Sequence, residues 1–431
     1  MTTNGGSWVT QRTLALQYSR AFRLFLVGRA VSHTGTGAHA VAVGWVVWQI
    51  TTGDPLALGL VLGCQFAPQL CAGPVLGALV DRWPRHRAML IQQTCALMLA
   101  ALMATLVLTD MAQLWVIYLL MLGVGLSTAA SNPLQQALLG EMVPSGPHRQ
   151  SAVALNSVTF QAGSLAGAGL AALLLPLLGA GAVMLISPTT YLIAITTLAL
   201  IRARDLTLPT SPPGSGPGTT GLRRLAADIA FGLSHMRATP ELRTALVLSA
   251  AVSVLGMGAL QTGAQTLVMS NHASTPARDA VVLGWATAAV SLGGIAAQIH
   301  VAGACAPTLR TLARYVTALA LGLIGAAVVG FLPLVLAMVA VSAWMAYGHQ
   351  TLAQVVLHRA PEHLKGRVSG WWFAVGSGGK ALAGPTAGLL ATLLGPGAGM
   401  LTAGLLLAAV ALGVLALQLQ RRSFPTHHHR A

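Results

Sequence analysis

The sequence predicts an all-α membrane protein whose twelve transmembrane helices form two six-helix halves. Composition, the spacing of apolar runs and the placement of basic residues predict it. Of 431 residues, 55% are hydrophobic and only 8% are charged, whereas a soluble globular chain carries about 25% charged residues. A soluble fold could not cover so much apolar surface, and a disordered chain needs low hydrophobicity. Spanning segments are expected to be helices, because each backbone polar group in lipid must be satisfied within its own segment.

The apolar runs give the elements in order, at about 20 residues or more per crossing. They cover residues 22–50, 56–80, 88–109, 112–140, 150–178, 182–201, 243–271, 279–304, 308–330, 331–358, 366–394 and 397–419. A hydrophilic stretch separates the sixth run from the seventh, and its Pro-, Gly- and Ser-rich middle is typical of a flexible linker. The chain therefore divides into an N-terminal half (1–204), a linker that could include a short amphipathic helix (205–242) and a C-terminal half (243–431).

Basic residues fix the expected orientation. With the N-terminus in the cytoplasm, all but three of the 24 Lys and Arg residues fall on the cytoplasmic side. The exceptions are Arg278 outside, and Arg29 and Lys380 within spans. Because basic residues collect in cytoplasmic loops, both termini and the linker are predicted to be cytoplasmic. The net charge of +15 then reflects topology rather than a nucleic-acid partner.

The two halves carry a trace of internal repetition. The segment entering the fifth span and the segment entering the eleventh share Pro, Arg, Ser, Leu and Gly at nearly equal spacing. These residues are Pro144, Arg149, Ser151, Leu165 and Gly167 in the first half, and Pro361, Arg367, Ser369, Leu382 and Gly384 in the second. Repeated six-span units are what a secondary transporter needs, because alternating access moves one half against the other.

The most specific motif lies between spans two and three. It contains Gly77, Asp81, Arg82, Arg85 and Arg87. A glycine allows two helices to approach closely, and an acid among arginines can hold one closed state and release in another. With Glu141, Arg149 and Arg367 at the same membrane face, these residues form the predicted cytoplasmic gate. The alternative is a plain basic loop, for which the arginines alone would suffice.

This loop resembles signature A of the major facilitator superfamily. Further segments are similar to the branch that contains the enterobactin exporter and macrolide efflux pumps, namely residues 22–32, 49–59, 65–68, 132–137, 154–157 and 366–370. The resemblance implies the major facilitator fold and a secondary exporter, often proton-coupled, in a bacterial inner membrane. Many relatives carry an acid in span one where this chain has Thr36, and the fifth-span motif lacks its proline at Ala168.

No carboxylate is expected at mid-membrane. All nine acids lie at span ends or in loops: Asp54, Asp81, Asp110, Glu141, Asp205, Asp228, Glu241, Asp279 and Glu362. A proton antiporter normally keeps a titratable acid in its cavity. Coupling would therefore use Asp81, Glu141, Asp279 or histidines, which titrate near neutral pH.

Polar residues inside spans are the candidates for a substrate cavity, because they are costly in lipid and usually face the bundle interior. The set is Arg29, His33, Thr36, Gln65, Gln69, Gln261, Gln265, His349, Gln350 and Lys380. Lys380 stands out because a mid-span lysine does not easily reach either surface, and it could attract an anionic substrate. The alternatives are that Arg29 reaches the headgroups and that the others form helix–helix hydrogen bonds.

The expected function is export of a small neutral or anionic metabolite, siderophore-like or antibiotic-like, by alternating access, with proton antiport as one means of coupling. An importer working by symport remains an alternative, as does a polytopic lipid-modifying enzyme, although the few acids disfavour an Asp-rich metal site. We expect a monomer in the lipid bilayer, with no enzymatic activity, cofactor, metal or nucleic-acid partner.

Overall fold

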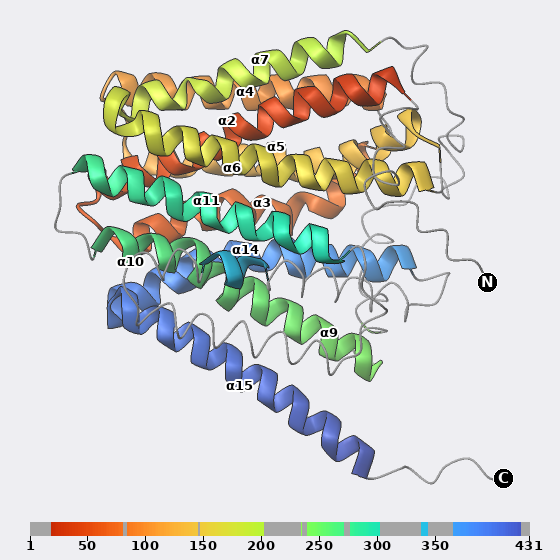
Figure 1. The fold of residues 1–431 in the computed structure, drawn as a ribbon. Helices are drawn as coiled ribbons and strands as arrows, with labels where there is room; N and C mark the ends of the chain where they lie inside the picture. Colours follow the sequence, from red (N-terminus) through yellow and green to blue (C-terminus); the bar gives the residue numbers. More distant parts are fainter. Residues whose placement is uncertain are drawn as a thin grey trace.

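The computed structural model describes residues 19–80, 84–144, 147–201, 234, 239–270, 276–301, 338–343 and 365–423. Across these ranges the regular structure is helical. Figure 1 shows most of the helices running side by side as long rods, with α9 and α15 inclined to the rest. Residues 205–233 of the predicted linker, span nine and most of span ten lie outside the described ranges.

The first spans agree with their predicted positions to within a few residues. They are α2 (Arg20–Ile50), α3 (Pro55–Val80), α4 (Arg85–Leu108), α5 (Leu114–Met142), α6 (Pro147–Met184) and α7 (Ile186–Ala199). Side chains cap two of their starts, where backbone N–H groups have no partner within the helix. Ser19 Oγ accepts from the Phe22 amide at 3.3 Å, and Asp54 Oδ1 accepts from the Leu56 amide at 2.9 Å.

Gly179 marks the boundary between spans five and six. Its backbone has φ 78° and ψ 168° within α6, a region that is essentially restricted to glycine. Helical geometry is therefore interrupted here, within the gap predicted between residues 178 and 182. One long apolar stretch of sequence is thus divided by a residue without a Cβ atom.

Span seven departs from the expected continuous helix. It consists of α9 (Pro240–Ala251), two π-helical turns η2 (Val252–Gly256) and η3 (Ala259–Gly263), and α10 (Ala264–Ser270). A π turn bonds residue i to i+5 and often marks a functional site. Apolar composition predicts a span but not its bonding register, so the sequence could not reveal these turns.

The remaining helices are α11 (Pro276–Val301), α14 (Lys365–Leu394) and α15 (Pro396–Ser423). The most extensive contacts between them and the first six helices are those of α3 with α14 and of α6 with α11. In the α3–α14 contact, Gly59 and Gly384 meet backbone to backbone. In the α6–α11 contact, Gly284 lies against Ala172, and Gly294 lies against the Gln161 side chain. Small residues allow this close approach between membrane helices.

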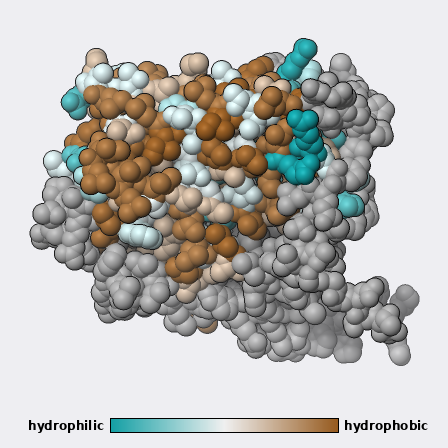
Figure 2. Space-filling view, turned by 45° about the horizontal axis from the view of Figure 1, so that its top comes forward, coloured by the Kyte–Doolittle hydropathy of each residue, from teal (hydrophilic) through white to brown (hydrophobic). Residues whose placement is uncertain are grey.

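The described surface is largely apolar. Figure 2 shows hydrophobic side chains over most of the described part of one face, with hydrophilic ones toward its edges. Within the described ranges, five helical stretches are long and apolar enough to cross a membrane: Arg85–Leu108, Leu114–Met142, Ser151–Met184, Leu242–Leu267 and Pro396–Val414. Exposed leucines such as Leu177, 77% exposed, and Leu393, 69% exposed, would be unfavourable in water. This surface suits a lipid environment.

Candidate functional site

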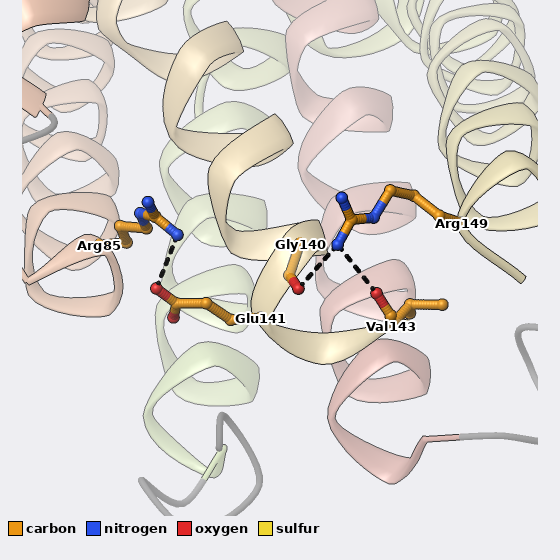
Figure 3. Close-up of polar contacts among 5 residues, drawn as sticks. All are labelled: Arg85, Gly140, Glu141, Val143 and Arg149. Atoms are coloured by element: carbon orange, nitrogen blue, oxygen red, sulfur yellow. Dashed lines mark hydrogen bonds and ion pairs between the residues drawn. The ribbon is translucent and has the colours of Figure 1, made fainter. Parts of the chain in front are cut away.

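A polar cluster ties three helix ends together in the first six helices (Figure 3). Arg85 Nη1, at the start of α4, donates to Glu141 Oε1 at 3.1 Å. Arg149, near the start of α6, donates from Nη2 to the Gly140 and Val143 carbonyls at 3.1 and 3.4 Å. These carbonyls belong to the end of α5, where helical partners are missing. We call Arg85, Glu141 and Arg149 the helix-end cluster.

The other predicted gate residues are only partly placed. Arg87 is exposed on the first turn of α4, and Gly77 and Arg367 lie within α3 and α14. Asp81 and Arg82 fall outside the described residues. The helix-end cluster joins helices of one half to each other, so its role as a gate between halves remains a prediction.

Span one buries its polar face. Arg29, Ser32, His33 and His39 are at most 8% exposed, whereas Val27 is 56% exposed. Val27 lies about 200° around the helix from Arg29. Gly28 packs on Thr197 of α7, and Gly163 of α6 packs on His33. The polar face of α2 is therefore turned into its own half, among α4, α6 and α7.

The contacts on this face are specific. Arg29 Nη2 lies 2.9 Å from His33 Nε2, one turn further along α2. The guanidinium therefore points toward the middle of the helix rather than back to its start, which disfavours the alternative that Arg29 reaches the headgroups. Thr36 Oγ1 lies 3.3 Å from the Tyr191 hydroxyl on α7. The His33 ring meets Phe160 of α6 edge-on, with centroids 4.7 Å apart.

A small pocket lies beside Arg29 and includes a residue that the sequence did not single out. Phe25 and Gly28 line it from α2, Met89 and Gln93 from α4, and Ala194, Thr197 and Leu198 from α7. Gln93 is only 2% exposed, and its Oε1 has no partner among the described residues, nor has Arg29 Nε. A polar residue within an apolar run was the available signal for Gln93.

Lys380 lies in the α3–α14 contact. Its Nζ sits 5.4 Å from the centroid of the Phe66 ring, within the roughly 6 Å range of a cation–π interaction. Lys380 forms no ion pair with a carboxylate of the described residues. Phe66 is the second residue that the sequence did not indicate, because its relevance depends on how α3 meets α14.

The remaining cavity candidates are spread over several elements. Gln65 and Gln69 are half-buried on α3, and Gln261 and Gln265 are half-buried on η3 and α10. Gln261 Oε1 is buried with no partner among the described residues. His349 and Gln350 lie outside those residues. The cavity assignment of the whole set therefore stays a prediction.

The acids that the structure describes lie at helix ends, as expected. Asp54 precedes α3, Asp110 follows α4, Glu141 is near the end of α5, and Glu241 and Asp279 fall in the first turns of α9 and α11. No cluster of three metal-ligand side chains occurs within the described ranges. Among the described residues, the charged side chains in the interior of the spans are thus the cations Arg29 and Lys380.

An apolar helical bundle whose halves meet through paired small-residue contacts defines a multi-pass membrane protein. The sequence profile of the Major Facilitator Superfamily matches residues 25–384. The chain belongs to this superfamily and is a membrane transporter of that type.

Named relatives fit this assignment. The chain is 25% identical to the multidrug efflux pump Tap of Mycolicibacterium fortuitum over 397 residues, covering 88% of this chain and 93% of Tap. Its fold is similar to that of the nucleoside transporter NupG, with TM-score 0.68, 11% identity, and coverage of 94% of this chain and 100% of NupG. A POT family transporter in complex with a thioalcohol-conjugated peptide gives TM-score 0.70 at 10% identity, covering 93% and 96% of the two chains.

Proposed function

We propose that this protein is a secondary active efflux transporter of a bacterial inner membrane. It exports a small neutral or anionic metabolite, siderophore-like or antibiotic-like, by alternating access between its two halves. The similarity to a multidrug efflux pump supports outward transport of a small molecule. The cytoplasmic placement of both termini, drawn from the basic residues, belongs to the same proposal.

One observation carries the choice of substrate charge. Lys380 lies where α3 meets α14, and its described partner is an aromatic ring rather than a carboxylate. A substrate that binds between the halves would therefore meet an ammonium group whose charge is not neutralised there. Favourable Coulomb energy in a medium of low dielectric then selects an anionic group over a cationic one.

The first test compares metabolites in the medium and cells of a deletion strain and its complemented parent. An exported compound accumulates inside the deletion strain and disappears from its medium. A compound that stays outside the deletion strain would instead indicate import and overturn the proposal.

The second test complements the strain with Lys380→Gln and, as a matched control, Lys365→Gln at the first residue of the same helix. We expect Lys380→Gln to lose export of anionic compounds at least tenfold and Lys365→Gln to retain it. Unchanged export of every anionic compound by Lys380→Gln would contradict the charge argument.

A further inference from the structure

The contact between Arg29 and His33 determines which ring nitrogen of His33 carries the proton. All nitrogens of a guanidinium are donors, with no acceptor among them. At 2.9 Å from Arg29 Nη2, His33 Nε2 must therefore accept, and the imidazole carries its proton on Nδ1. A second proton on Nε2 would set two donors and two positive charges against each other at this distance. The described geometry is therefore that of neutral His33.

Among the residues that the structure describes, no acid lies beside His33. The helices packed on α2, together with α4 beside the pocket, bring these described titratable or charged side chains: Cys64, Arg85, His86, Arg87, Cys95, Tyr118, Glu141, His148, Arg149 and Tyr191. On α2 itself lie Arg20, Arg23 and His39. Tyr191 reaches Thr36, and Glu141 is paired with Arg85. No described carboxylate contacts Arg29 or His33.

We propose that His33 is the residue through which this transporter binds its coupling proton, and that Arg29 holds the deprotonated state. A proton from water binds Nε2, and the hydrogen bond from Arg29 to that nitrogen is given up. When the imidazolium returns its proton to water, the Arg29 hydrogen bond forms again. The inference rests on the proposed function only in assuming alternating access between the two halves. It adds that proton binding and release drive this conformational change.

The structure also offers a route from this pair to the contact between the halves. The His33 ring lies edge-on against Phe160, and the next residue, Gln161, packs against Gly294 of α11. A change of side-chain position at His33 thus acts on the residue next to the α6–α11 contact. Closely packed interiors pass such displacements on because they leave few voids.

A conformational measurement without substrate tests the proposal. The full chain, with its four cysteines replaced by alanine, is spin-labelled at the exposed positions Met98 of α4 and Leu412 of α15 in lipid nanodiscs. The distance distribution is recorded from about pH 8 down to about pH 4, which extends below the usual histidine range because the Arg29 guanidinium beside His33 disfavours a second positive charge. His33→Gln keeps an acceptor for Arg29 without titrating. His39→Gln is the control, because His39 is buried on the same helix and its ring nitrogens have no described partner.

The distance distribution should contain two conformational populations, one favoured at high pH and one at low pH. We expect their ratio to change with pH in the parent and in His39→Gln, approaching about tenfold per pH unit for one proton. His33→Gln should keep the high-pH distribution throughout, which also shows that it is folded. The proposal is overturned if the parent does not respond, if His33→Gln responds like the parent, or if His39→Gln is equally insensitive. None of these results bears on export, which the metabolite comparison decides separately.

Nitrogen NMR of the parent chain gives an independent check on the pair itself. With labelled histidine, the His33 resonance at neutral pH should show protonated Nδ1 and unprotonated Nε2. Arg29→Gln should reduce this tautomer preference, because the fixed donor is gone. A His33 ring protonated at Nε2 in the parent would overturn the proposal without any transport measurement.

Discussion

Arg85, the first residue of α4, and Glu141, near the end of α5, are joined by an ion pair of 3.1 Å whose side chains are 27% and 18% exposed. Solvent screens such a pair, so we expect Glu141→Gln to lower the free energy of unfolding by less than about 1 kcal/mol. Thermal unfolding in detergent measures this. Arg87→Gln, which removes an exposed charge from the same turn of α4, is the control.

The same variant tests the predicted gate. If Glu141 only ties α5 to α4, transport by Glu141→Gln should follow its small loss of stability. If the pair also stabilises a closed state, the transport rate should change by up to about fivefold, which corresponds to about 1 kcal/mol of gating free energy. Equal rates in Glu141→Gln and Arg87→Gln would contradict the gate.

Gly59 tests how tightly the halves meet. A Cβ atom at this position would overlap the Gly384 carbonyl on α14, and backbone atoms cannot rotate away. We expect Gly59→Ala to destabilise the protein by about 1–3 kcal/mol and to weaken transport. Gly413→Ala on α15 meets no described atom within 4 Å and should be neutral or slightly stabilising. Similar unfolding midpoints for the two variants would show that the α3–α14 contact is looser than described.

Gly179 allows a comparison within one helix. Its φ of 78° and ψ of 168° disfavour any residue with a Cβ atom, so Gly179→Ala should cost about 1–3 kcal/mol. Gly169, ten residues earlier in α6, meets no described atom within 4 Å, and Gly169→Ala should gain up to about 1 kcal/mol from helix propensity. Opposite shifts of the unfolding midpoint are the expected result, and shifts of the same sign would contradict the assigned backbone.

Much of the fold follows from the sequence because membrane spans are set by length and apolarity. The ends of α2, α3 and α14 lie within a few residues of their predicted positions. The acids of the described residues fall at helix ends for the same reason, since a carboxylate inside a span is costly. The turns of η2 and η3 were not predictable, because α and π bonding require similar apolar residues.

The candidate site was less accessible to sequence reasoning. Helical periodicity correctly places Arg29, His33 and Thr36 on one face of α2, but it cannot say which neighbours that face meets. The structure turns it toward Gln93 and Phe160. Likewise, a lysine within span eleven is evident from the sequence, whereas its aromatic partner on span two depends on tertiary packing.

The Phe66 ring bears on how tightly an anion binds to Lys380. The Lys380 ammonium lies 5.4 Å from the Phe66 centroid, and a substrate anion that binds the ammonium must compete with this interaction. Cation–π contacts contribute about 0.5–2 kcal/mol, so Phe66→Leu should strengthen binding of an exported anion by roughly twofold to thirtyfold. The apparent affinity in proteoliposome efflux measures this, with Leu70→Ala, on the same helix against Gly378, as a control for packing. Weaker binding in Phe66→Leu alone would mean that the ring contacts the substrate instead of competing with it.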